Sequence, residues 1–174
     1  MDLRDATADD APAIVVIYNH YVLNTTISFE ESVVTEADMR ARIEAVRDSG
    51  LPWIVATEGG EIVGYAYATK WRVRHAYRFS VESSVYVANN VARKGIGCAL
   101  YTALMAQLRD SGVHLVIGGI AQPNPASVAL HERMGFVKVA LFEEVGFKFG
   151  RWIDVGYWQL KLSAQPDTAA LPPE

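Results

Sequence analysis

Apolar residues recur at helical spacing in two stretches of the N-terminal half. The first follows Thr7-Ala8-Asp9-Asp10, which has the spacing of a capping box with Asp in place of Glu, and it predicts a helix over about residues 8–23. A second start signal, Thr35 to Asp38, precedes a similar pattern that Gly50 ends. Residues 24–34 between the two predicted helices have no regular pattern.

Two short apolar runs, residues 53–57 and 62–67, flank Gly59-Gly60. Glycine pairs accept the positive φ angles of a tight hairpin turn, so these runs predict two antiparallel strands.

A third strand is expected over residues 80–87, because its residues alternate in character. One face of this strand has Val81, Val85 and Val87, and the other has Glu82, Ser84 and Tyr86. A strand with one polar face is a candidate for carrying functional groups.

The C-terminal half continues with alternating helices and strands. We expect a helix from Gly95 to Asp110, a strand at 115–117, a short helix capped by Asn124-Pro125 and closed by Gly135, and strands at 137–141 and 155–162. From Ser163 onwards the chain has three prolines and small polar residues, and it predicts a disordered tail over residues 163–174. Because the hairpin requires antiparallel neighbours, the pattern predicts one α/β domain, residues 1–162, with a mixed sheet.

The composition fits a single domain, since the chain has 174 residues of which 51% are hydrophobic. Its 16 Lys and Arg nearly balance 20 Asp and Glu, and the absence of a basic run argues against nucleic acid binding. A lone cysteine, no signal peptide and no long apolar window predict a soluble, cytoplasmic protein that does not bind membranes.

The stretch Ala92-Arg93-Lys94-Gly95-Ile96-Gly97-Cys98 joins a predicted strand to a predicted helix. Such a turn aims free backbone N–H groups and the positive helix end at an anion, and Arg93 and Lys94 add positive charge. The stretch matches neither the P-loop nor the dinucleotide fingerprint. It predicts a diphosphate site of another kind, the alternative being an ordinary loop with two solvated cations.

These residues resemble the GNAT N-acetyltransferases, whose hallmark is Gln/Arg-x-x-Gly-x-Gly/Ala at the start of a helix; here Ala92 occupies the first position. Asn124 with Ser127, and Leu130 to Phe136, are similar to the family's closing pattern. Within the family the likeness is greatest to phosphinothricin and methionine sulfoximine acetyltransferases. It runs from about Leu3 to Leu162 and implies a mixed, largely antiparallel sheet flanked by helices.

The resemblance implies acetyl-CoA as cosubstrate and no metal. The residues expected to bind it are Val85, Tyr86 and Val87 along the strand, Arg93, Lys94, Gly95, Ile96, Gly97 and Cys98 at the pyrophosphate, and Asn124. Asn124 also has a purely local interpretation as a helix cap, and the two roles are compatible. We expect the backbone N–H of Cys98, rather than its thiol, to be the useful group.

Direct attack of an amine on a thioester needs a base, an oxyanion donor and an acid. Glu82 is the candidate base, directly or through water; its alternative is a salt bridge to Arg72 or Arg74. His131 is the candidate acid, and its alternative is a half-buried structural histidine. A backbone N–H near Val87 is the candidate oxyanion donor.

The acceptor is expected to bear a carboxylate, because Arg72 and Arg74, in the connection before the strand at 80–87, can clamp one; the alternative is that both are solvated loop arginines. Further candidates for acceptor contact, apart from Glu82, are Val73, Ser83, Ser84, Phe29 and Trp152, with Glu30 as another pocket wall. The predicted function is acetylation of the α-amine of phosphinothricin, methionine sulfoximine or methionine sulfone by a homodimeric enzyme. The alternatives are another amine, such as an antibiotic, a polyamine or a protein N-terminus, and a non-catalytic CoA-binding module.

Overall fold

The computed structural model describes residues 1–91 and 95–162. Arg93, Lys94 and the predicted tail, residues 163–174, lie outside the described residues. The elements are β1 (Asp2–Asp5), α1 (Ala11–Asn24), α2 (Glu36–Asp48), β2 (Trp53–Glu58), β3 (Glu61–Lys70), β4 (Ser80–Val87), α3 (Ile96–Asp110), β5 (Leu115–Ala121), α4 (Pro125–Arg133), β6 (Val137–Lys148) and β7 (Arg151–Lys161), with short 3₁₀ helices at Ala8–Asp10 and His75–Tyr77. The predicted alternation of helices and strands is confirmed.

The strands of the described residues form one sheet in the order β1-β2-β3-β4-β5-β7-β6. The β2–β3 hairpin is antiparallel as predicted, and β4 with β5 is the parallel pair. The mixed, largely antiparallel sheet is therefore confirmed.

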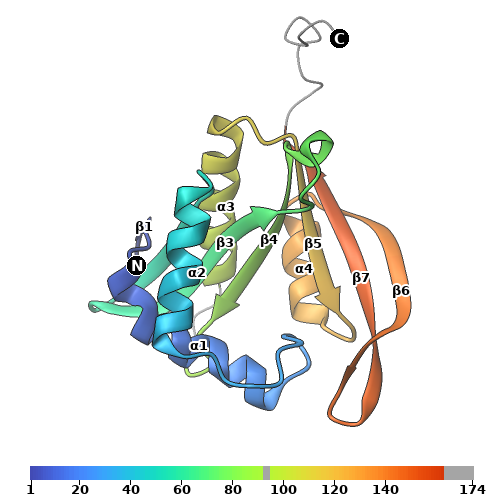
Figure 1. Ribbon diagram of the computed structural model, residues 1–174, viewed down its shortest axis with the longest axis horizontal. Helices are drawn as coiled ribbons and strands as arrows, with labels where there is room; N and C mark the ends of the chain where they lie inside the picture. Colours follow the sequence, from blue (N-terminus) through green and yellow to red (C-terminus); the bar gives the residue numbers. More distant parts are fainter. Residues whose placement is uncertain (92–94, 163–174) are drawn as a thin grey trace, which may run out of the picture.

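Helices cover both faces of the sheet (Figure 1). Helices α1 and α2 pack on one face against side chains such as Trp53, Val55 and Tyr65. Helix α3 packs on the other face against Ile54 and Ala56, and the apolar side of α4 joins this second cluster. Neighbouring residues of β2 thus point into different cores, as the two-residue period of a strand requires.

Strands β4 and β5 pair over only three positions, from Ser80 with Leu115 to Glu82 with Ile117. Beyond Glu82 the two strands spread apart towards the lower end of the molecule (Figure 1). The main-chain groups of β4 that face β5 are consequently left without a strand partner over the second half of β4.

Several boundaries differ from the predicted ones. Strand β1 had no predicted counterpart, because its four residues are all exposed and do not alternate. The first helix opens with the 3₁₀ turn at Ala8–Asp10 before α1 begins. Strand β5 continues past residue 117 to Ala121, and β6 and β7 are longer than the predicted strands. No helix described in 1–91 and 95–162 is long and apolar enough to cross a membrane.

Candidate active site

Three connected hollows lie along the opening between β4 and β5. The inner cavity, about 50 Å³, is lined by Ser84, Val85, Tyr86, Asn124 and His131 among others. A groove of about 230 Å³ continues from it past Val87, Gly97 and Leu130. The outer cavity, about 590 Å³, lies on the α1 side and includes Tyr18, Phe29, Glu30, Glu82 and Tyr157. Ser84 and Tyr86 line both the inner and the outer cavity, so the two hollows meet at β4.

The groove reaches the N-terminus of α3. Gly95 precedes this helix with a φ of +110°, which an L side chain rarely adopts, and no side chain caps the helix. The first amide groups of α3 are therefore available to an anion. Gly97 lies against Leu130, where an ideal Cβ would come 3.1 Å from its Cδ2. Ile96 is buried and Cys98 is a partly buried free thiol.

Glu82 projects from β4 into the outer cavity. Burial raises the pKa of its carboxyl group, and the nearby positive charge of Arg72 opposes that rise. The ion pairs of the described residues are Arg4–Asp10, Arg40–Asp9 and Arg42–Glu30, so neither Arg72 nor Arg74 forms a salt bridge with Glu82. A half-buried carboxylate with an elevated pKa is suited to accepting a proton near neutral pH.

His131 lies on the opposite side of β5, only 3% exposed. Its Nδ1 is 2.8 Å from the Ser127 carbonyl oxygen, which can only accept, so Nδ1 carries the proton and donates. Its Nε2 lies 3.1 Å from the hydroxyl of Tyr101 and accepts from it. Burial lowers the pKa of His131, so the imidazole is neutral at neutral pH.

Two adjacent glycines of β5 leave space for the side chains of His131 and Glu82. An ideal Cβ on Gly118 would lie 2.5 Å from His131 Nε2, and one on Gly119 would lie 3.1 Å from Glu82 Oε1. Neighbouring strand residues point to opposite faces. Glu82 and His131 therefore approach β5 from opposite sides, next to the opening that separates β5 from β4.

Ser83 and Asn124 have local partners. The hydroxyl of Ser83 lies 3.3 Å from that of Tyr101, on the face of β4 opposite Glu82. The side-chain oxygen of Asn124 accepts from the Ser127 amide, which caps α4, while Asn124 also lines the inner cavity and the groove.

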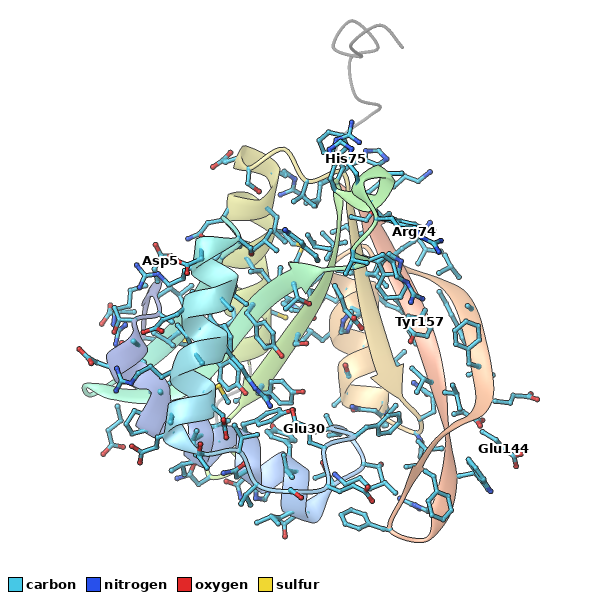
Figure 2. The ribbon with its side chains drawn as sticks, in the orientation of Figure 1. Asp5, Glu30, Arg74, His75, Glu144 and Tyr157 are labelled. Atoms are coloured by element: carbon cyan, nitrogen blue, oxygen red, sulfur yellow. The ribbon has the colours of Figure 1, made fainter. Side chains whose placement is uncertain are left out.

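Glu30 forms a charged wall of the outer cavity (Figure 2). Arg42 donates to both of its oxygens at 2.6 and 3.1 Å, and the Tyr18 hydroxyl donates at 2.8 Å. The guanidinium of Arg42 is the main cause of the lowered pKa of Glu30, whose carboxylate is thus ionised at neutral pH.

The predicted acceptor clamp lies away from this wall. Arg72, Val73 and Arg74 are exposed in the β3–β4 connection, and Figure 2 places Arg74 far from Glu30. Arg72 stacks on Trp71 with its Cζ 4.8 Å from the ring centroid. None of the three lines the hollows described above, and neither does Trp152, which packs on Phe147 at the β6–β7 end.

Several contributors were missed from the sequence. Tyr101 lies on α3, Tyr157 on β7 and Arg42 on α2, and nothing local marks them as part of a site. Gly118 and Gly119 do carry a signal, because glycines inside a strand often mark a close approach of another group. Within the described ranges, no cluster of three His, Cys, Asp or Glu residues suited to a metal ion is found.

Comparison with known proteins gives a consistent result. A family model described as an acetyltransferase (GNAT) domain matches residues 3–156. The chain is 44% identical to a phosphinothricin N-acetyltransferase of Alcaligenes faecalis, over 95% of this chain and 85% of that protein. It is 40% identical to an L-methionine sulfoximine/L-methionine sulfone acetyltransferase of Pseudomonas aeruginosa, over 92% of this chain and 94% of that protein. The structure superposes with a TM-score of 0.91 on a phosphinothricin acetyltransferase of Sinorhizobium meliloti in complex with acetyl-CoA, at 40% identity, covering 99% of this chain and 93% of that one.

Proposed function

The chain belongs to the GNAT family as an acetyl-CoA-dependent N-acetyltransferase, and we propose that it acetylates the α-amine of a small amino acid analogue. The candidate acceptors are phosphinothricin, methionine sulfoximine and methionine sulfone. The observation that carries the proposal is the outer cavity, where the carboxyl group of Glu82 faces a space that opens onto the β4–β5 gap.

Acetyl-CoA supplies the acetyl group as its thioester. We assign its pantetheine arm to the main chain of Val85, Tyr86 and Val87, along the edge of β4 that β5 leaves open, and its pyrophosphate to residues 93–98. The free amides at the start of α3 and the groove that passes Gly97 and Asn124 support this assignment. A backbone N–H near Val87 is our assignment for the oxyanion donor.

The reaction begins when Glu82 takes a proton from the acceptor ammonium, directly or through one water. The amine nitrogen then attacks the thioester carbonyl carbon, becomes positively charged and gives up its second proton to water. The resulting oxyanion collapses to the amide as the carbon–sulfur bond breaks. The departing CoA thiolate takes up a proton. The raised pKa of Glu82 supports the first step, because a stronger base removes an ammonium proton more readily.

We assign protonation of the thiolate to His131. Its ring lines the inner cavity, from the side of β5 opposite Glu82, which keeps the acid apart from the base. Because burial lowers its pKa, only a minor fraction of His131 is protonated at neutral pH. Thiolate protonation is therefore the step that should weaken as the pH rises.

For the acceptor, we assign the α-carboxylate to Arg72 and Arg74, and further contacts to Val73, Ser83 and Ser84. Support comes from Arg72, whose positive charge acts on Glu82 and Tyr157 in the outer cavity. Phe29 lines the outer cavity, and Trp152 on β7, which lies outside that cavity, is assigned as a further contact. The names of the relatives support an amino acid analogue over a polyamine or a protein N-terminus.

The test is a thiol-release assay with acetyl-CoA and a panel of amines. The panel contains the three analogues, the matching amines without a carboxylate, and a polyamine. A kcat/KM at least tenfold higher for the carboxylate-bearing analogues supports the proposal, and a preference for amines without a carboxylate overturns it. In the same assay, the variants Arg72→Met and Arg74→Met measure the separate contribution of each arginine to kcat/KM.

We also propose that the enzyme is a cytoplasmic homodimer with a detoxifying role. Support for the dimer comes from β6, which lies at the sheet edge and exposes the apolar side chains of Val137, Val139 and Leu141. Sedimentation velocity of Leu141→Lys tests it: a shift to monomer supports the dimer through β6, and an unchanged sedimentation coefficient overturns it. The matched control is Val16→Lys, at an exposed apolar position on α1.

A further inference from the structure

Lys148, the last residue of β6, is a buried charged side chain that the proposed reaction does not use. Its relative exposure is 1%, which is rare for a lysine. The partners of its amino group are two main-chain carbonyls: Nζ donates to Val22 at 2.7 Å and to Ser28 at 2.6 Å. These acceptors are 126 and 120 residues away in sequence, so the contact joins distant parts of the chain.

The two acceptors have different roles. Val22 lies in the last turn of α1, where carbonyls have no partner within the helix, and a cation there also interacts favourably with the helix dipole. Ser28 lies in the irregular segment after α1, which continues into Phe29 and Glu30. One amino group thus ties the end of α1 and this segment to the β6–β7 hairpin.

A second contact joins the same two parts. An ideal Cβ on Gly146 would lie 2.4 Å from two ring carbons of Phe29, so the ring rests directly on the main chain of β6. Ser28, Phe29 and Glu30 from one side and Val145 from the other line the outer cavity. The wall of this cavity is therefore formed by two segments that Lys148 and Gly146 hold together.

We propose that Lys148 is a positioning residue for the acceptor: it fixes the Ser28–Glu30 wall against the β6–β7 hairpin, so acceptor binding depends on it and acetyl-CoA binding does not. The inference rests on the proposed function, which puts the acceptor in the outer cavity. The hollows assigned to acetyl-CoA are lined chiefly by β4, β5, α3 and α4, and the amino group of Lys148 bonds to none of these elements. The groove also includes Tyr21, and both hollows include Ile27, each one residue before an acceptor of Lys148.

The test is Lys148→Met, which keeps a long unbranched side chain without the amino group, assayed with the best acceptor of the panel. Hydrogen bonds to charged groups are each worth about a factor of ten or more, so we expect the acceptor KM to rise about tenfold. The acetyl-CoA KM should stay within about twofold of wild type, because most of the lining of the cofactor hollows belongs to elements that Lys148 does not bond to. Lys138→Met is the matched control on the same strand; the side chain of Lys138 lies 5.4 Å from the Trp158 ring, and its acceptor KM should not change.

An acceptor KM within about twofold of wild type overturns the inference. So does an equal rise in both KM values, or a fall in kcat alone, since a general loss of structure would produce either. If Lys148→Met does not fold, Gly146→Ala is judged by the same criteria; its added methyl group displaces only the exposed Phe29 ring.

Failure of the proposed function is recognised separately, as wild-type enzyme that acetylates none of the amino acid analogues. Amide hydrogen exchange then tests Lys148 without an acceptor. Faster exchange in Lys148→Met confined to residues 25–31 and the hairpin end supports the inference, and unchanged exchange there overturns it.

Discussion

Gly118→Ala tests whether the close approach of His131 to β5 matters. The new Cβ would lie 2.5 Å from Nε2 and 2.7 Å from Cδ2 of His131, where an ordinary contact is 3.4 Å or more. The ring must therefore retreat by about 0.9 Å. It has little room, because it is 3% exposed and packs edge-on against Tyr101 and Phe136 with ring centroids 5.1 and 5.0 Å away. A shift of this size along the contact breaks the 3.1 Å hydrogen bond to Tyr101.

The size of the effect follows from that displacement. Overpacking a core costs about 1–3 kcal/mol in free energy of unfolding. For a chain of this length each kcal/mol lowers Tm by about 2–4 °C, so Tm should fall by about 2–12 °C. A misplacement of about 1 Å at a reacting group costs about a hundredfold in rate, which is the expected fall in kcat.

Calorimetry measures Tm, and the thiol-release assay measures kcat and the acetyl-CoA KM. The matched control is Gly119→Ala, whose Cβ faces the other side and needs Glu82 and Tyr157 to move by only a few tenths of an ångström. We expect it to lower Tm less than Gly118→Ala does.

The decisive comparison uses His131→Ala. Without the imidazole ring, the methyl group of Gly118→Ala meets open space, so the double variant should unfold within about 1 °C of His131→Ala alone. If Gly118→Ala lowers Tm as much in the His131→Ala background as in wild type, the steric reasoning is refuted.

Four further outcomes are expected. Glu82→Gln should lower kcat by about 10²–10⁴-fold, while Glu61→Gln at an exposed strand start should not. The base form of Glu82 is lost as pH falls through its raised pKa, so wild-type kcat/KM should drop on acidification while the pH is still above the ordinary value of 4.5; a profile flat down to 4.5 contradicts the assignment. The acid form of His131 is lost as pH rises through its lowered pKa. The wild-type kcat should therefore begin to decline at a pH below 6.5 and continue to fall as the pH rises, whereas His131→Ala should show no such decline. Arg42→Met should raise the acceptor KM about three- to tenfold, because it removes the ion pair that holds Glu30. Arg40→Met removes the ion pair with Asp9 and should leave the acceptor KM unchanged. Equal effects of the two variants would mean that the position of Glu30 does not matter for the acceptor.

The features that sequence predicted well are those decided locally. Gly59 and Gly60 have φ angles of +57° and +87°, so the hairpin turn follows from two residues that tolerate such angles. The Thr35 hydroxyl accepts from the Asp38 amide at 3.1 Å and starts α2 where the capping pattern indicated. Strand β4 has the predicted bounds because its alternation reflects two different environments, a core on one face and a cavity on the other.

The features that sequence did not predict depend on contacts between distant segments. Tyr101 is 30 residues before His131, and its position beside the imidazole follows from α3 and α4 covering the same face of the sheet. Two segments that form the wall of the outer cavity are joined by Lys148, whose amino group donates hydrogen bonds to two carbonyls more than 100 residues away in sequence. No periodicity within a segment carries this information, because it resides in how the elements pack.

The alternation in β4 also creates a problem that only the sheet geometry resolves. Glu82 and His131 approach β5 from opposite faces, and a continuous sheet would keep a base and an acid in those positions from ever meeting one substrate. Here the pairing of β4 with β5 ends at Glu82, so an opening runs through the sheet from one face to the other. A thioester inside that opening would be reachable from both faces. Because Gly118 and Gly119 have no side chains, His131 and Glu82 can each come close to β5 at this point. In the proposed reaction, the end of strand pairing at Glu82 is thus what would allow a carboxylate and an imidazole on opposite faces to act on one thioester.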